Sequence, residues 1–211
     1  MRQYPIDKIR NVGILGHGGC GKTSLVEAAL KFAGVSERFG TVADGTTVTD
    51  FDPEEIKRKI SINSAIASFE YNDTKINIID TPGYFDFVGE IVQSVRVADS
   101  AVIVISGKSG VTVGAEKSWD YCVKRNIPKI LFINKMDAEH ADFHKVMDQL
   151  RDKFGKTVAP FQVPIIENYK MQGFVDILHM RAKYFQDGPL LDADIPENML
   201  EEINPIREMI I

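Results

Sequence analysis

The sequence predicts an α/β fold built on a mostly parallel sheet with helices on both faces. Up to about residue 155, short β-branched apolar runs alternate with longer amphipathic stretches, which is the element order of a doubly wound sheet. The apolar runs are nearly continuous, as expected for strands that are buried on both faces. Ligands of such sheets bind at the carboxyl ends of the strands, so we expect functional residues in the loops that follow them.

The strands and helices of this sheet follow one another in a regular order. Four apolar runs predict its inner strands, at residues 11–15, 76–79, 101–105 and 129–133. The more alternating segment 64–71 favours an edge strand. Amphipathic stretches predict helices at residues 22–33, 87–98, 114–126 and 140–154. Residues 34–60 have no clear assignment, and a loop of that length inside a domain is usually functional or mobile.

A change of pattern near residue 155 divides the chain into two parts. Residues 1–155 form the expected α/β core, and residues 156–211 begin a small α+β insertion. The second part holds strand-like pieces at 161–165 and 173–178, followed by an acidic helix at 196–210. Because that helix is still amphipathic where the chain stops, we expect the chain to be a fragment.

Composition narrows the class of protein. The 211 residues are 44% hydrophobic and 26% charged, which excludes collagen-like, disordered and disulfide-rich chains. A net charge of −5 offers no broad basic face, so we expect no sequence-specific binding to nucleic acid. Two cysteines, Cys20 and Cys122, favour a reducing compartment. With no apolar run near the ~20 residues of a membrane span, we expect a cytoplasmic protein with no membrane partner.

A glycine-rich loop follows the first expected strand. Gly16-His-Gly-Gly-Cys-Gly-Lys-Thr23 matches the pattern G-x-x-x-x-G-K-[ST], and a helix is expected directly after it. Glycines allow the backbone N–H groups of such a loop to approach phosphates closely, next to the positive N-terminus of the helix. Lys22 would neutralise the β- and γ-phosphates, and the hydroxyl of Thr23 would ligate Mg²⁺. The motif predicts a P-loop NTPase fold.

Three glycines of this loop also match the dinucleotide-binding pattern, as Gly16-x-Gly18-x-x-Gly21. That pattern requires a second strand ending in an acidic residue about 20 positions later. Glu37 stands at this distance, but residues 34–40 contain no apolar run that could form the strand. We therefore favour the mononucleotide interpretation, in which the lysine after the last glycine has a role.

Two further motifs end later strands of the expected sheet. Asp80-Thr-Pro-Gly83 follows the third strand; its aspartate can hold Mg²⁺ through a water, and the N–H of Gly83 can reach a γ-phosphate. Asn134-Lys-Met-Asp137 follows the fifth strand. The carboxylate of Asp137 can accept hydrogen bonds from N1–H and the N2 amino group of guanine, donors that adenine lacks. The stem of Lys135 can cover the base, and Asn134 can tie the loop to the phosphate side. We expect guanine, with a helix N-cap as the alternative role of Asp137.

In this order the motifs make the chain resemble the N-terminal GTP-binding domain of the elongation factor G family of translational GTPases, or of a close elongation-factor-G-like paralogue. The resemblance extends over essentially the whole chain. The segments that carry it are 16–24, 58–62, 80–87, 94–99, 110–111 with Trp119, and 134–137. The segment from 162 to 177 resembles the start of the insertion that this family carries in its GTP-binding domain.

The resemblance implies a switch that binds and hydrolyses GTP and acts on the ribosome, mainly through domains outside this chain, with GTP or GDP and Mg²⁺ as cofactors. Lys22, Gly83 and Tyr84 would take the catalytic positions. Thr23, Ser61 and Asp80 would take the metal positions, with residues 44–62 as the first switch. The nucleotide-binding positions would be Gly16, His17, Gly18, Gly19, Cys20, Gly21, Lys22, Thr23, Ser24, Asp80, Gly83, Asn134, Lys135 and Asp137.

Departures from the family gather around the expected γ-phosphate. The family carries a histidine that orients the attacking water where this chain has Tyr84. Its phosphate loop has an apolar residue and an aspartate in the places of Gly18 and Gly19. Its first switch has glycine and threonine in the places of Lys59 and Ser61. Our first hypothesis is a GTPase with altered or compensated turnover. The alternative is a guanine-nucleotide-binding interaction module with little or no hydrolysis.

Overall fold

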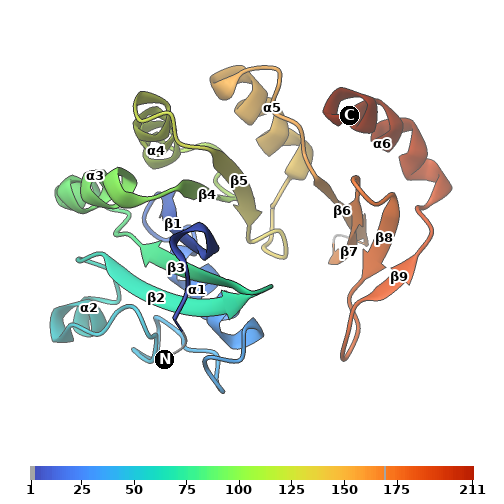
Figure 1. The fold of residues 1–211 in the computed structure, drawn as a ribbon. Coiled ribbons are helices and arrows are strands. Elements are labelled where there is room, and N and C mark those ends of the chain that lie inside the picture. Colours follow the sequence, from blue (N-terminus) through green and yellow to red (C-terminus); the bar gives the residue numbers. More distant parts are fainter. Residues whose placement is uncertain (1–2, 169) are drawn as a thin grey trace. The chain divides into compact units, whose positions relative to one another are not determined.

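The computed structural model describes residues 3–168 and 170–211, and the chain divides into two compact units (Figure 1). The first unit extends to Lys135 and the second begins at Met136. This division precedes the change of sequence pattern at residue 155, because helix α5 (Phe143–Phe154) belongs to the second unit. The start of the family's insertion at residue 156 stays a prediction.

A five-stranded sheet forms the centre of the first unit, in the order β2-β3-β1-β4-β5. Its strands are β1 (Ile9–Gly16), β2 (Ala65–Tyr71), β3 (Thr74–Asp80), β4 (Ser100–Ser106) and β5 (Lys129–Asn134). Strands β3, β1, β4 and β5 are parallel, and β2 pairs antiparallel with β3 at the edge. The predicted mostly parallel α/β fold is therefore confirmed.

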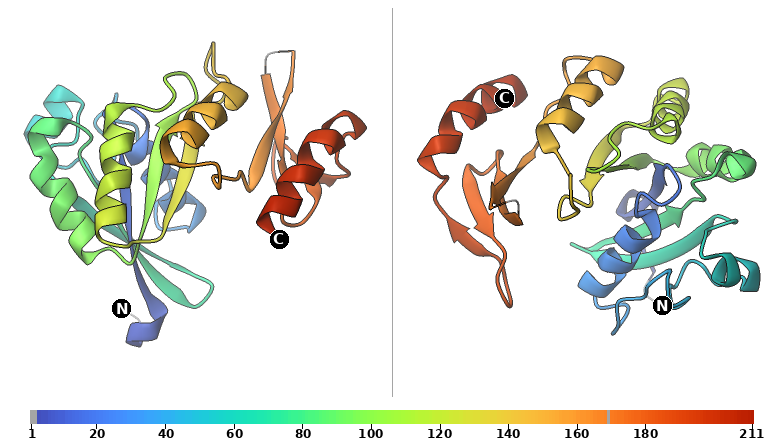
Figure 2. Two further views of the ribbon diagram at one scale, coloured as in Figure 1. Left: turned by 90° about the horizontal axis from the view of Figure 1, so that it is seen from above. Right: turned by 180° about the vertical axis from the view of Figure 1, so that it is seen from behind.

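Helices cover both faces of this sheet (Figure 2). They are α1 (Lys22–Phe32), α3 (Val88–Val97) and α4 (Val113–Lys124), with short 3₁₀ helices η1 (Ile6–Lys8) and η2 (Phe85–Phe87). Helix α1 lies on one face, and α3 and α4 lie on the other. Val26 and Leu30 of α1 are buried in one cluster with Ile14 and Ile78 of the sheet. Each such side chain contributes about 1.5–3 kcal/mol when fully buried, so this cluster fixes α1 against β1 and β3.

One short helix lies in segment 34–60, which has no clear assignment from the sequence. Helix α2 (Pro53–Arg58) begins with a capping box: the Asp52 side chain accepts a hydrogen bond from the N–H of Glu54, and Glu55 accepts one from the N–H of Asp52. Proline fits the first helical position because the missing N–H would have no partner there. The pattern Asp-Pro-Glu-Glu is thus a local signal that predicts this helix.

The second unit combines two helices with a small antiparallel sheet. Its elements are α5 (Phe143–Phe154), β6 (Gln162–Glu167), β7 (Lys170–Asp176), β8 (Arg181–Tyr184), β9 (Leu191–Ala193) and α6 (Glu197–Ile210). The strands pair in the order β6-β7-β8-β9. The expected α+β character of this part is confirmed. The sequence pattern does not predict β8 and β9, because strands of four and three residues are too short to show a period.

Candidate functional site

The glycine-rich loop lies between β1 and α1. Gly16, Gly19 and Gly21 have positive φ angles of 136°, 74° and 100°, a region that residues with a side chain rarely enter. A Cβ atom at Gly16 would also overlap the carbonyl oxygen of Val104, and one at Gly21 would overlap Nδ2 of Asn134. The wrapped conformation of the loop therefore requires glycine at these positions.

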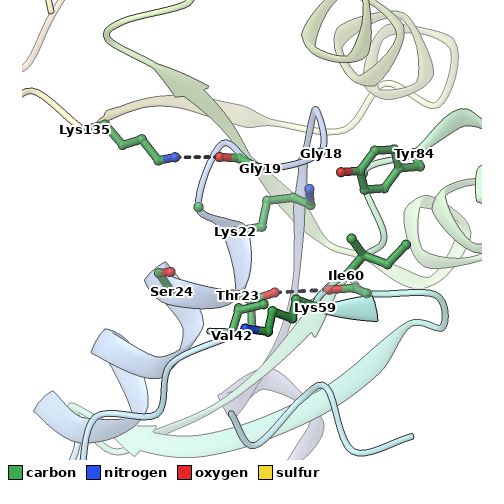
Figure 3. Close-up of a pocket in the computed structure, with 13 residues that line it drawn as sticks. Gly18, Gly19, Lys22, Thr23, Ser24, Val42, Lys59, Ile60, Tyr84 and Lys135 are labelled. Atoms are coloured by element: carbon green, nitrogen blue, oxygen red, sulfur yellow. Dashed lines mark hydrogen bonds between the residues drawn. The ribbon is translucent and has the colours of Figure 1, made fainter. Parts of the chain in front are cut away.

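A cavity of about 230 Å³ opens beside this loop (Figure 3). Its lining residues all belong to the first unit; they are Gly18, Gly19, Gly21, Lys22, Thr23, Ser24, Val42, Lys59, Ile60, Ser61, Gly83, Tyr84 and Lys135. Three of them are lysines from separate segments, at the start of α1, after α2 and after β5. Three ammonium groups around one cavity favour a ligand that carries several negative charges.

Lys22 reaches back over the loop. Its Nζ atom donates hydrogen bonds to the carbonyl oxygens of Gly16 and His17, at 3.2 and 3.0 Å. Gly83 lies against the ammonium group of Lys22 and the backbone of Gly18. A Cβ atom at residue 83 would overlap Nζ of Lys22 and would lie 2.5 Å from the backbone N of Gly18. The turn after β3 and the glycine-rich loop therefore touch through their backbones, and a side chain at residue 83 would separate them.

Hydroxyl groups surround the carboxylate of Asp80, at the end of β3. Oγ1 of Thr23 and Oγ1 of Thr49 each donate a hydrogen bond to Oδ2 of Asp80 at 2.8 Å. The Ser61 hydroxyl lies 3.3 Å from Oγ1 of Thr23. Among the residues that the structure describes, the buried Oδ1 of Asp80 has no hydrogen-bond partner. Hard oxygen ligands of this kind are those that Mg²⁺ prefers, so Thr23, Ser61 and Asp80 fit this ion.

Asp50 is a second buried carboxylate near this cluster, and no sequence motif marks it. Its Oδ2 accepts a hydrogen bond from Thr47 at 3.4 Å, while its buried Oδ1 has no partner within residues 3–168 and 170–211. Burial raises the pKa of Asp50. Burial also raises the pKa of Asp80 to about 6, although the hydroxyls of Thr49 and Thr23 oppose the shift. A cation at this place would offset the desolvation of both carboxylates.

Substituting Asp80 should have opposite effects on metal binding and on the stability of the metal-free protein. We expect Asp80→Asn to abolish the effect of Mg²⁺ on nucleotide affinity, yet to raise the free energy of unfolding of the metal-free protein at pH 8. The raised pKa corresponds to a gain of at most about 3 kcal/mol, from which the cost of burying the amide N–H groups is subtracted. The pKa of the folded carboxyl is raised, so its ionised form destabilises the fold above pH 6, and this penalty fades as the pH falls. Urea unfolding with a chelator at pH 8 and pH 5 should therefore show the larger gain at pH 8; an equal gain at both would contradict the explanation.

Two residues at the end of β5 hold the glycine-rich loop from its other side. Nδ2 of Asn134 donates a hydrogen bond to the carbonyl oxygen of Cys20 at 3.0 Å, and Nζ of Lys135 donates one to that of Gly19 at 2.7 Å. Figure 3 shows the stretched side chain of Lys135 reaching Gly19.

Asp137 belongs to the second unit, where its side chain is exposed. Its role toward a base stays a prediction. The alternative role of Asp137 as a helix N-cap is wrong, because α5 begins after Asp142, whose side chain accepts a hydrogen bond from the N–H of Lys145 at 3.0 Å.

The other predicted loop residues have different surroundings. The His17 ring lies 6.1 Å from that of Phe85, and a Cβ atom at Gly114 would be 2.9 Å from its Nδ1, so His17 is packed between the η2 turn and α4. Ser24 is exposed at the cavity. Cys20 is buried, and burial raises the pKa of its thiol, so it is not a reactive thiolate at neutral pH.

Lys59 occupies a position that favours glycine. It ends α2 with a φ of 56°, in the left-handed conformation that costs a residue with a side chain about 1–2 kcal/mol. The conformation explains why glycine suits this place in the family that the chain resembles. Here the side chain of Lys59 instead adds an ammonium group to the cavity.

Comparison with known proteins identifies the family. The family model described as the elongation factor Tu GTP binding domain matches residues 7–204. The chain belongs to this family. Among relatives of this GTP-binding domain, an elongation factor G of Granulibacter bethesdensis is 39% identical over 215 residues, covering 100% of the chain and 31% of the relative. An elongation factor G of Gluconobacter oxydans is 39% identical over 210 residues, covering 98% of the chain and 30% of the relative.

The solved structures support the same fold for this GTP-binding domain. A crystal structure of a protein from Thermus thermophilus matches 95% of the chain with a TM-score of 0.90 and 33% identity, and the match covers 30% of that protein. The chain therefore spans less than a third of the length of these relatives. Setting aside residues 1, 2 and 169, the domain contains no helix that is long and apolar enough to cross a membrane.

Proposed function

We propose that this domain binds GTP and GDP with Mg²⁺ and hydrolyses GTP, as the switch domain of an elongation-factor-G-like translation factor. The cluster of Thr23, Ser61 and Asp80 supports this most directly, because it brings two hydroxyls and an unpartnered carboxylate oxygen of the described chain to the first turn of α1. Phosphoryl transfer depends on positioning and on charge, and the cavity with its three lysines offers both.

In this proposal, different residues around the cavity bind the phosphates, the metal ion and the attacking water. The Lys22 ammonium binds the β- and γ-phosphates, and the N–H of Gly83 donates a hydrogen bond to the γ-phosphate. Thr23, Ser61 and Asp80 hold the Mg²⁺ side. When bound, Mg²⁺ supplies neutralisation of the charge that develops on the phosphate oxygens. The Tyr84 hydroxyl lies at the cavity and can hold the attacking water by one hydrogen bond.

Selection of the base depends on the motif that ends β5. Asn134 and Lys135 are bonded to the phosphate loop, which supports a base site continuous with the phosphate site. In this proposal the Lys135 stem covers the base, and the Asp137 carboxylate accepts hydrogen bonds from guanine. The whole factor would act on the ribosome in the cytoplasm, where the two free cysteines stay reduced.

A titration with fluorescent GDP and a fluorescent non-hydrolysable GTP analogue, with and without Mg²⁺, tests the proposal. We expect saturable binding that Mg²⁺ strengthens and that unlabelled GTP reverses, whereas ATP at the same concentration does not. The Asp80→Asn variant is the matched control for the metal effect. Equal competition by ATP and GTP would contradict the guanine assignment, and the absence of any nucleotide binding would overturn the proposal.

Substitution of Asp137 tests the base assignment separately. We expect Asp137→Asn to weaken GDP binding about ten- to hundredfold, because charge-assisted hydrogen bonds to the guanine donors are worth about 1.5–3 kcal/mol. The variant should in turn favour xanthosine diphosphate, whose base presents a carbonyl to the new amide. Competition of both nucleotides against fluorescent GDP measures the change. Unchanged GDP affinity would show that Asp137 does not contact the base, and the base assignment would be wrong.

Phosphate release distinguishes the GTPase from the alternative, a module that binds guanine nucleotides but hardly hydrolyses them. Single-turnover release of phosphate from GTP by the complete factor, with and without ribosomes, is the appropriate measurement. Stimulation by ribosomes would support the switch, and binding without any release would support the module. Loss of a water-positioning group can slow hydrolysis by ~10²–10⁴-fold, so the assay must extend over hours.

A further inference from the structure

The hydroxyl-bearing end of the Tyr84 ring lies against Gly18 of the phosphate loop. A Cβ atom built at Gly18 would be 2.8 Å from Cζ, 2.9 Å from Cε2 and 3.1 Å from Cε1 of Tyr84. Contacts below 3.0 Å are essentially never made by real Cβ atoms, so the ring and a side chain at residue 18 cannot occupy these positions together. The two residues are 66 positions apart in the sequence, and only the fold brings them together.

The Tyr84 side chain is not held by a buried position in the core. Tyr84 is 40% exposed, and it precedes the short η2 turn. Gly18 has no positive φ angle, so its backbone would accept a side chain. Nothing in the loop conformation therefore demands glycine at this position, unlike Gly16, Gly19 and Gly21. The feature that demands it is the tyrosine ring.

The contact also places the tyrosine hydroxyl. Figure 3 shows the oxygen of Tyr84 on the side of the ring that faces Lys22. Tyr84, Gly18 and Lys22 all line the cavity, and the backbone of Gly83 touches both Gly18 and Lys22. The hydroxyl thus lies at the end of the cavity where the lysine and the turn after β3 meet.

We propose that Gly18 and Tyr84 are a matched pair, in which the missing side chain at residue 18 admits the phenol and holds its hydroxyl over the phosphate end of the cavity. Gly18 is thereby a positioning residue that acts through Tyr84. The inference rests on the proposed function for its effect on hydrolysis, but not for its effect on the ring. A side chain at residue 18 moves the ring outward at little expense in stability, because the ring is the free end of an exposed side chain.

Fluorine NMR of the 211-residue chain labelled with 3-fluorotyrosine tests the position of the ring directly. The chain has six tyrosines, and the signal of Tyr84 is the one that Tyr84→Phe removes. We expect Gly18→Val to shift this signal and to leave the others and the melting temperature nearly unchanged. The matched control is Gly89→Ala, since a Cβ atom at that position of α3 meets nothing within 4 Å. An unmoved Tyr84 signal in Gly18→Val would overturn the pairing.

Kinetics of the same variants test the consequence for the reaction. We expect Gly18→Val to lower the single-turnover rate of hydrolysis of bound GTP about three- to tenfold, the value of one hydrogen bond. In a Tyr84→Ala background, the same substitution should have no further effect. An equal loss in both backgrounds would overturn the pairing. Absence of nucleotide binding in every variant would overturn the proposed function instead, while the fluorine signal would still decide the pairing.

Discussion

Substituting Gly21 by alanine should lower the affinity for GDP by at least about 30-fold. Gly21 has a φ of 100°, and enforcing a left-handed backbone on a residue with a side chain costs about 1–2 kcal/mol. The added Cβ atom would also overlap Nδ2 of Asn134 and break its hydrogen bond to Cys20, at about 1–3 kcal/mol for the groups left unpaired. The two contributions together correspond to about 30- to several-thousandfold in affinity.

Titration with fluorescent GDP measures this loss, and a second variant separates its causes. Asn134→Ala removes the clash and the hydrogen bond together, so adding Gly21→Ala to it should cost only the backbone strain. Gly89→Ala, which adds a methyl group to open space on α3, serves as the control. Additive losses from Gly21→Ala and Asn134→Ala would show that the two residues do not interact as the structure has them.

Removing the carboxylate of Glu27 should destabilise the segment 40–50, which this side chain holds by hydrogen bonds. Glu27 lies on α1 and is fully buried. It accepts a hydrogen bond from the N–H of Gly40 at 3.0 Å and another from the N–H of Val48. Hydrogen bonds to a charged group contribute about 1.5–3 kcal/mol each, and Glu27→Ala leaves both N–H groups without their acceptor. We expect a loss of about 3–5 kcal/mol, either in global stability or as local opening of residues 40–50.

Hydrogen exchange distinguishes the two outcomes for Glu27→Ala. Selective loss of protection at Gly40 and Val48, with the core of the sheet unchanged, indicates local opening, whereas a lower urea midpoint indicates global destabilisation. Glu37→Ala removes an exposed carboxylate of the same segment and should change neither quantity. Wild-type protection at Gly40 and Val48 in Glu27→Ala would show that this carboxylate does not anchor the segment.

The sequence predicts those parts of the fold that carry a local pattern. The continuous apolar runs predict the parallel strands, and the alternating segment 64–71 predicts the edge strand β2. The capping box of Asp52 and Glu55 is a local signal for helix α2. This signal is hard to recognise because it lies in a charged run within a long segment that has no clear assignment. Strands β8 and β9 carry no such signal, because their few residues are too short to establish a period.

The candidate site likewise contains residues that a local sequence pattern predicts and residues that no pattern marks. The glycine spacing, the aspartate of β3 and the residues after β5 are adjacent in sequence to elements that can be predicted. Thr49 and Asp50 lie in the unassigned segment 34–60, and no motif marks Glu27 within its predicted helix. Thr49 and Glu27 matter because they are buried against residues 13 to 31 positions away. The contact between Gly18 and Tyr84 is of the same kind. Each residue is visible in the sequence as a departure from the family, but their proximity arises only when β1 and β3 become neighbours.

The double attachment of the chain after β5 to the phosphate loop bears on how a nucleotide leaves. Asn134 and Lys135 hold successive carbonyl groups, those of Cys20 and Gly19, so the segment that we propose for the base and the loop that we propose for the phosphates are fastened together. Moving one of them away from the other would break both hydrogen bonds. With GDP bound as proposed, a partner that displaces either segment would therefore also loosen the other end of the nucleotide.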